Sequence, residues 1–189
     1  MCVIYDKATE NDIEMLTRFR LDYVEEDIGG VREDERDIIE ERLPIYYREH
    51  LGKDFHVYVA RIGEHIKDCV DIKDYGDAHD REDCKNQEYC KNYEACGEIV
   101  GCCFLLVTEK PANPNFINGL TGTVLNVYVK PEYRRQGIAK RMLENLLKDA
   151  KEMGLDYVEL KSTEDGHELY KGLGFEDEVS RYYRMKKML

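Results

Sequence analysis

The hydrophobic pattern changes its period in the second half of the chain. Apolar side chains occupy every second position of residues 125–130, which is the period of a strand with one buried face. The apolar positions of this strand are Leu125, Val127 and Val129. Pro131 ends it, because proline cannot donate a backbone hydrogen bond. Over residues 138–153 apolar residues recur at three- and four-residue steps before Gly154, which predicts an amphipathic helix.

The same reading predicts alternating strands and helices along the rest of the chain. Thr9 is a helix cap with Asp12 three residues later, and Gly29-Gly30 ends that helix. Pro44 is expected to interrupt or bend the helix that follows. We expect strands at 2–7, 55–62, 98–109, 157–160 and 180–189, and helices from 9 to about 27 and from about 32 to 50.

Residues 63–96 do not fit this alternation. The segment is polar and carries four of the seven cysteines, namely Cys69, Cys84, Cys90 and Cys96. We interpret it as an insertion between the second and third strands of a single domain, residues 1–189. The spacing of these cysteines is wider than structural zinc usually requires, so we expect no metal. A metal site completed by His79 or Cys69 remains an alternative.

The connection between the strand at 125–130 and the helix at 138–153 has the features of an anion site. Gly137 has no Cβ, so a phosphate can approach the backbone closely. The first N–H groups of a helix have no partner within the helix, and the helix dipole adds positive charge there. Arg134, Arg135 and Lys140 add positive charge around this point, and Ala139 is small. Gln136 and Ile138 complete the loop and the first helical position. A pyrophosphate would fit such a loop.

The loop resembles the acyl-CoA-binding motif of the GNAT superfamily of N-acyltransferases. The family signature Arg/Gln-x-x-Gly-x-Gly/Ala corresponds to Arg134, Gly137 and Ala139. A second family element, Asn-x-x-Ala-x-x-Leu-Tyr-x-x-x-Gly-Phe, is similar to residues 163–175. This chain keeps its Leu-Tyr and Gly-Phe pairs but has Thr163 and Gly166 in place of Asn and Ala.

The resemblance implies an α/β fold with a mixed, mostly antiparallel central sheet flanked by helices. It also implies that acetyl-CoA is the acyl donor and that the backbone of Val127 and Val129, the loop 134–140 and Thr163 hold it. Tyr170 matches the family's general acid, which protonates the departing thiolate. Backbone N–H groups around Val127, freed by a bulge, would polarise the thioester carbonyl.

The resemblance also places the amine acceptor beside the connection between the first two helices. Glu25, Glu26 and Asp27 are candidates to bind a cationic substrate there, and Asn126 lies where some relatives carry a carboxylate. Deprotonating an alkylammonium of pKa about 10.4 at pH 7 costs about 4.6 kcal/mol, so a base is needed. Asn126 cannot be that base. Glu25, Glu26 and Glu98 are candidates, and the choice among them stays open.

Composition narrows the range of partners and compartments. Residues 1–98 hold 27 Asp and Glu against 14 Lys and Arg, whereas residues 99–189 hold 13 against 14. This acidic first half argues against nucleic acid, which requires cationic surfaces. The apolar run at 99–107 is too short for a membrane span. With no signal peptide and an odd number of cysteines, we expect a cytoplasmic protein with reduced thiols, and a homodimer is possible.

The sequence is compatible with three alternative functions, each from a different class of protein. The first is an N-acetyltransferase that moves an acetyl group from acetyl-CoA directly to a primary amine of a small molecule or peptide. The second is a non-catalytic module that binds acyl-CoA, which the changes at Thr163 and Gly166 and the unassigned base favour. The third is a metal-binding or interaction protein that uses the insertion at 63–96.

Overall fold

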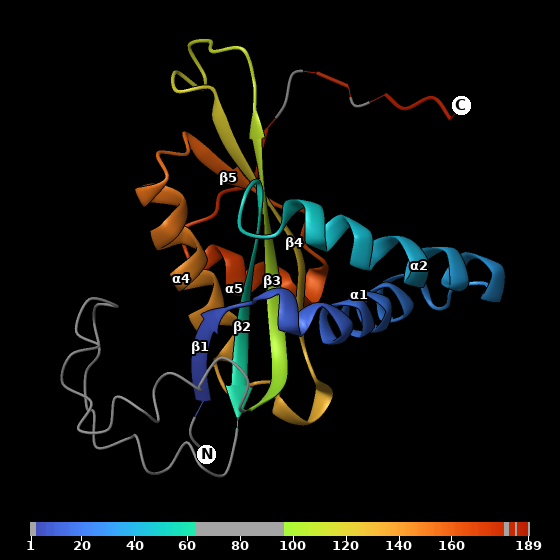
Figure 1. The fold of residues 1–189 in the computed structure, drawn as a ribbon. Coiled ribbons are helices and arrows are strands. Elements are labelled where there is room, and N and C mark those ends of the chain that lie inside the picture. The colour runs from blue at the N-terminus through green and yellow to red at the C-terminus, as the bar shows by residue number, and fades with distance from the viewer. Residues whose placement is uncertain (1–2, 63–96, 180–181, 184, 189) are drawn as a thin grey trace.

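The computed structural model describes residues 3–62, 97–179, 182–183 and 185–188 (Figure 1). A five-stranded sheet with the order β1-β2-β3-β4-β5 forms its centre. All neighbouring strands are antiparallel except β4 and β5, which are parallel. The strands are β1 (Val3–Lys7), β2 (Phe55–Ile62), β3 (Glu98–Glu109), β4 (Leu120–Val129) and β5 (Tyr157–Glu159). The predicted α/β fold with a mostly antiparallel sheet is confirmed.

Two pairs of helices cover the two faces of the sheet (Figure 1). Helices α1 and α2 bury one apolar cluster against β2 and β3, centred on side chains such as Phe19, Tyr47 and Phe104. Helices α4 and α5 cover the opposite face, where Met142 and Leu143 are fully buried. The α-helices are α1 (Ile13–Ile28), α2 (Glu33–His50), α4 (Ile138–Glu152) and α5 (Glu164–Lys171), and η1 (Glu10–Asp12) and η5 (Pro131–Tyr133) are short 3₁₀ turns.

The helix signals read from the sequence correspond closely to these bounds. The Asp12 carboxylate accepts a hydrogen bond from the Thr9 backbone N–H at 2.8 Å, as expected for a capping box. Gly29 adopts the left-handed conformation that ends α1, and Gly154 adopts it after α4. Helix α2 continues through Pro44, so the predicted interruption is wrong, and the alternative of a bend there stays a prediction.

A bulge in β4 changes which face its side chains occupy. Cys102 pairs with Tyr128 and Phe104 pairs with Leu125, so Cys103 alone opposes both Asn126 and Val127. Val127 therefore packs with the cluster under α4, whereas Leu125 packs with the cluster under α1 and α2. The prediction that Leu125, Val127 and Val129 share one face is wrong for Leu125, because the extra residue shifts the alternation. The bulge itself lies where the family resemblance implied.

The parallel pairing of β4 with β5 is short. It covers only residues 121–123 of β4, although the strand continues to Val129. Within the part of the chain that the structure describes, residues 124–129 thus have a strand partner on the β3 side alone. This divergence leaves room between the end of β4 and helix α5.

The predicted last strand is not found. The described residues from 182 to 188 have no strand assignment, and in Figure 1 this end of the chain leads away from the sheet. A run of suitable residues forms a strand only when another strand pairs with it, and β5 is the last strand of the sheet. The prediction of an insertion at 63–96 lies outside the described residues.

None of the helices described is long and apolar enough to span a membrane.

Candidate active site

A hollow of about 900 Å³ opens where β4 loses β5 as its neighbour. Four segments form its walls: the end of α1, the end of β4, the loop that leads into α4, and helix α5. Its lining residues are Tyr23, Glu26, Asp27, Val127, Tyr128, Val129, Tyr133, Arg134, Arg135, Gly137, Ile138, Ala139, Lys140, Thr163, Asp165, Gly166, Leu169 and Tyr170.

The sequence predictions locate most of this hollow. Twelve of its lining residues were predicted as site residues: Glu26, Asp27, Val127, Val129, Arg134, Arg135, Gly137, Ile138, Ala139, Lys140, Thr163 and Tyr170. Gln136, Glu25 and Asn126 were also predicted but do not line it.

The loop before α4 has the backbone of an anion site. Gly137 precedes the first turn of the helix with φ of 79°, in the left-handed region where a side chain would be strained. A Cβ at this position would meet nothing within 4 Å, so the space beside the backbone is open. The first turn of α4 contains no acidic residue. Unpaired N–H groups, the helix dipole and an open approach fit a phosphate or pyrophosphate.

Arg134 is fixed by three neighbours. Its Nε donates to the backbone oxygen of Val129 at 2.8 Å, and its terminal nitrogen donates to Glu26 at 2.6 Å. The guanidinium also lies over the ring of Tyr128, 5.6 Å from the centroid. The hydrogen bond with Glu26 raises the pKa of Arg134 above its usual value. Arg134 therefore joins the loop to β4 and to α1, while Arg135 and Lys140 supply further positive charge to the hollow.

The bulge brings Asn126 into an unusual backbone conformation. Its φ is 51°, which few residues other than glycine adopt, and asparagine is among those that tolerate it. The Asn126 side chain is buried, accepts a hydrogen bond from Arg20 at 3.2 Å and lies 3.5 Å from the Cys102 sulfur. Asn126 therefore helps to hold the bulge in place through its side-chain contacts with Arg20 and Cys102. Its role in substrate binding stays a prediction.

Helix α5 presents Tyr170 to the hollow. The Thr163 hydroxyl caps this helix by accepting from the Gly166 N–H at 3.3 Å. A Cβ at Gly166 would lie 3.1 Å from the Tyr170 ring, so the glycine leaves room for that ring. Phe175 contacts the same ring edge-to-face, with 5.9 Å between centroids. The substitutions at Thr163 and Gly166 are thus compatible with a well-positioned Tyr170.

Burial keeps the Tyr170 phenol protonated. Desolvation raises its pKa to about 12, and the neighbouring Tyr23 and Cys103 add to the rise. A neutral phenol can donate a hydrogen bond to a sulfur atom that gains negative charge. Complete proton transfer to a thiolate whose conjugate acid has a pKa near 8.5 would be uphill by about 5 kcal/mol. Tyr170 is therefore suited to hydrogen-bond donation more than to full protonation.

Acidic side chains gather at the end of α1, and only some of them face the hollow. Glu26 and Asp27 line it together with Tyr23. Glu25 instead forms an ion pair with Arg36 of α2. The sequence missed Tyr23, although its spacing of three from Glu26 and four from Asp27 places it on the same side of the helix.

A comparison with protein-family models identifies the chain's family. Residues 36–175 match the acetyltransferase (GNAT) family. The chain belongs to the GNAT family of acetyltransferases. The resemblance stated from the sequence motifs is thereby confirmed, and acetyl transfer is the chemistry of this family.

Solved structures share the fold at low sequence identity. A predicted acetyltransferase with acetyl-CoA from Clostridium acetobutylicum is 20% identical, with a TM-score of 0.69 over 98% of this chain and 96% of that one. A GCN5-related N-acetyltransferase from Ralstonia eutropha is 17% identical, with a TM-score of 0.65 over 97% and 99%. Glucosamine-6-phosphate N-acetyltransferase from Arabidopsis thaliana is 15% identical, with a TM-score of 0.60 over 99% and 100%. The comparison with curated proteins gave no match.

Within the described ranges, no group of three or more His, Cys, Asp or Glu side chains is arranged to hold a metal ion. The predicted alternative of a metal site in the insertion concerns residues outside those ranges.

Proposed function

We propose that this GNAT acetyltransferase transfers an acetyl group from acetyl-CoA to a primary amine of a small molecule or peptide. The observation that carries the proposal is the hollow itself. Its walls combine an anion-binding loop, a strand bulge, a protonated tyrosine and a pair of carboxylates. In the proposed reaction these features would serve, in that order, the pyrophosphate, the thioester carbonyl, the departing thiolate and the ammonium group.

The basic side of the hollow would hold the coenzyme. Backbone N–H groups at the start of α4 would bind its pyrophosphate, and Arg135 and Lys140 would add charge to that site. The backbone at Val127 lies next to the bulge, where the hydrogen-bond ladder is interrupted. N–H groups there are candidates to polarise the thioester carbonyl. Acetyl-CoA supplies the acyl group, whose C–S bond breaks as the amine nitrogen forms the new C–N bond.

The acidic side of the hollow would receive the amine. Glu26 and Asp27 attract an ammonium group and are candidates to accept the proton that it loses before attack. Tyr170 would donate a hydrogen bond to the departing sulfur and so lower the energy of the developing thiolate. The predicted roles of Glu25 and Asn126 in substrate binding are less direct, because Glu25 is paired with Arg36 and Asn126 is buried.

A coenzyme-binding module without turnover is the second candidate. It is favoured by Asn126, which replaces a carboxylate that some relatives carry and cannot act as a base. Both candidates bind coenzyme A, but only the enzyme releases thiol when an amine is supplied.

The experiment measures thiol release from acetyl-CoA with a panel of small amines and amino-terminal peptides, alongside calorimetry with coenzyme A. The enzyme gives binding and amine-dependent thiol release. Binding without release for every amine would support the second candidate, and no binding at all would refute both.

A further inference from the structure

The bulge in β4 is contacted by a side chain from the first helix. Arg20 of α1 lies 106 positions before Asn126, and its terminal nitrogen donates to the Asn126 side-chain oxygen at 3.2 Å. Asn126 is buried and Arg20 is half-buried. Because Asn126 is one of the two bulge residues that oppose Cys103, the guanidinium reaches the point where the alternation of β4 changes.

Cys102 contacts Asn126 from β3. Its sulfur accepts from the Asn126 side-chain nitrogen at 3.5 Å, and its thiol donates toward the Asn126 backbone oxygen at 4.0 Å. Burial raises the pKa of Cys102 to about 12, so the thiol stays neutral. The peptide between residues 126 and 127 is trans, and in a trans peptide the N–H and C=O groups point in opposite directions. The N–H of Val127 therefore points away from the Cys102 sulfur.

Arg20 also contacts the side of the active-site hollow that is proposed to receive the amine. Its guanidinium lies over the ring of Tyr23, 5.7 Å from the centroid, and Tyr23 lines the hollow together with Glu26 and Asp27. Burial raises the pKa of Tyr23 and Asp27 adds to the rise, whereas the charge of Arg20 opposes it. One guanidinium therefore links the bulge to this wall.

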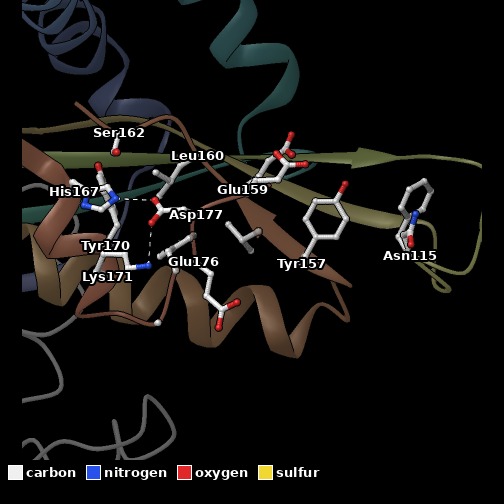
Figure 2. A pocket seen from close by; sticks show the side chains of 15 residues that line it. Asn115, Tyr157, Glu159, Leu160, Ser162, His167, Tyr170, Lys171, Glu176 and Asp177 are labelled. Carbon is white, nitrogen blue, oxygen red and sulfur yellow. Dashed lines mark hydrogen bonds and ion pairs between the residues drawn. The ribbon is translucent and has the colours of Figure 1, made fainter. Parts of the chain in front are cut away.

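Tyr170 also lines a second hollow, which measures about 680 Å³ and lies beside β5 (Figure 2). Tyr23 and Val127 line the active-site hollow and do not line the second one. Of these two hollows, only the active-site hollow is thus lined by a residue that Arg20 contacts.

The stability of the fold gives little reason for a cation at this place. No ion pair within the described ranges includes Arg20. Its half-buried guanidinium gives up hydration, and an amide oxygen and an aromatic ring compensate only part of that loss without a full negative charge. A side chain that stability does not explain, and that contacts two parts of a site, is expected to have a functional role.

We propose that Arg20 is a positioning residue that acts through Asn126 to hold the peptide between residues 126 and 127. The inference rests on the proposed function, in which the N–H of Val127 polarises the thioester carbonyl. A donor that is fixed in advance stabilises the negative charge developing on the carbonyl oxygen without having to reorient during the reaction. When Arg20 is absent, the Asn126 side chain loses a partner and the peptide can turn, so the hydrogen bond to the carbonyl weakens.

Nuclear magnetic resonance tests this inference without an acceptor amine. Acetyl-CoA labelled with carbon-13 at the thioester carbonyl is bound to the full chain, and polarisation of the carbonyl moves its signal downfield. We expect Arg20→Met to bind acetyl-CoA within about twofold of the unchanged protein and to lose at least half of that displacement. Arg20→Lys keeps a positively charged N–H donor, so it should retain more of the displacement than Arg20→Met.

The results separate this inference from the proposed function. A full chain that binds no acetyl-CoA would refute the proposed function and the inference with it. Binding with an undisplaced signal, or with the same displacement in Arg20→Met, would overturn the inference and leave the coenzyme site intact. Thermal melting shows whether each variant is folded, and Arg20→Gln takes the place of Arg20→Met if the latter is not.

Turnover with an amine from the panel provides a second test. We expect Arg20→Met to lower kcat about tenfold while the KM for acetyl-CoA changes little, since it weakens a hydrogen bond that is strongest in the transition state. Arg18→Met is the matched control, because the exposed Arg18 lies on the same helix and pairs with Glu14. In Asn126→Gly, adding Arg20→Met should lower kcat little further, since the link is already broken. Equal effects of Arg20→Met in both backgrounds, or an equal fall in the control, would overturn the inference.

Discussion

The guanidinium of Arg134 lies 2.6 Å from the carboxylate of Glu26, a residue 108 positions earlier in the chain. The contact joins the acidic end of α1 to the loop that begins the basic side of the active-site hollow. Arg134 is also held by the Val129 oxygen at 2.8 Å, so its position does not depend on Glu26 alone. Glu26 therefore lowers the net positive charge of the loop while facing the proposed amine site.

We expect Glu26→Gln to bind coenzyme A two- to threefold more tightly at low salt. Arg134 would remain on Val129 but lose its counter-charge, and both partners are partly exposed, so the effect is small. Isothermal calorimetry at two salt concentrations measures it. Glu25→Gln is the matched control, because Glu25 pairs with Arg36 instead. Weaker binding by Glu26→Gln would show that the pair chiefly orders the loop.

Tyr170→Phe should lower turnover at least tenfold and leave the affinity for coenzyme A almost unchanged. Tyr170 is half-buried and its pKa is raised to about 12, so the phenol is protonated at neutral pH, and the proposed hydrogen bond to sulfur forms as the thiolate departs. Steady-state thiol release and calorimetry give the two quantities. Tyr157→Phe, which does not line the active-site hollow, is the control. Unchanged turnover in Tyr170→Phe would remove Tyr170 from the mechanism.

A pH–rate profile should rise from pH 7 and show no decline near pH 10. The rise comes from deprotonation of the acceptor amine. An ordinary tyrosine would lose its donor proton near pH 10, but the pKa of Tyr170 is raised to about 12, so its neutral form persists over this range. Thiol release between pH 7 and 10.5 tests this, with circular dichroism confirming that the protein stays folded. A descending limb centred near 10 is the contrary result.

The charge at position 137 should control coenzyme binding more than the shape of the side chain there. Asparagine and aspartate have nearly the same shape, and both tolerate the left-handed φ of 79° that Gly137 adopts. We expect Gly137→Asp to bind coenzyme A at least tenfold more weakly than Gly137→Asn, since only the former places an anion beside the loop. Equal affinities by calorimetry would refute an anion site at this helix start.

The bulge should depend on the backbone of Asn126. We expect Asn126→Val to lower the free energy of unfolding by about 2 to 3 kcal/mol, since a β-branched residue at φ 51° is strained and the partner of Arg20 is lost. Asn126→Gly loses the same hydrogen bond but relieves the backbone, so it should be less destabilised. Chemical denaturation ranks the two variants, and the opposite order would contradict a strained bulge.

The sequence predicted the parts of the site that are local in the chain. Gly137 and its neighbours mark a helix start by their own conformational needs, and the Leu-Tyr pair of α5 lies on a helix with a cap at Thr163. These features depend on a few consecutive residues. Residues 134–140 were named from their local features and Tyr170 from the family motif. Apart from Gln136, the structure brings them to one hollow; their roles stay predictions.

The features that the sequence did not give depend on distant partners. Alternation alone put Leu125 on the wrong face. The family resemblance implied a bulge around Val127, but its effect on the face that Leu125 occupies is given only by the pairing with β3. The sequence gives no reason to assign different roles to the adjacent glutamates Glu25 and Glu26. In the structure, Glu25 pairs with Arg36 and Glu26 pairs with Arg134. Residues 180–189 have a strand-like composition, but composition does not say whether a partner strand is within reach.

Tyr170 lines two hollows, the active-site hollow and a second one of about 680 Å³ beside β5. A small molecule bound in the second hollow would contact this ring without occupying the proposed coenzyme loop, whose residues do not line it. The two hollows can therefore be filled independently, and a ligand of the second one is a probe of Tyr170 that leaves the loop free.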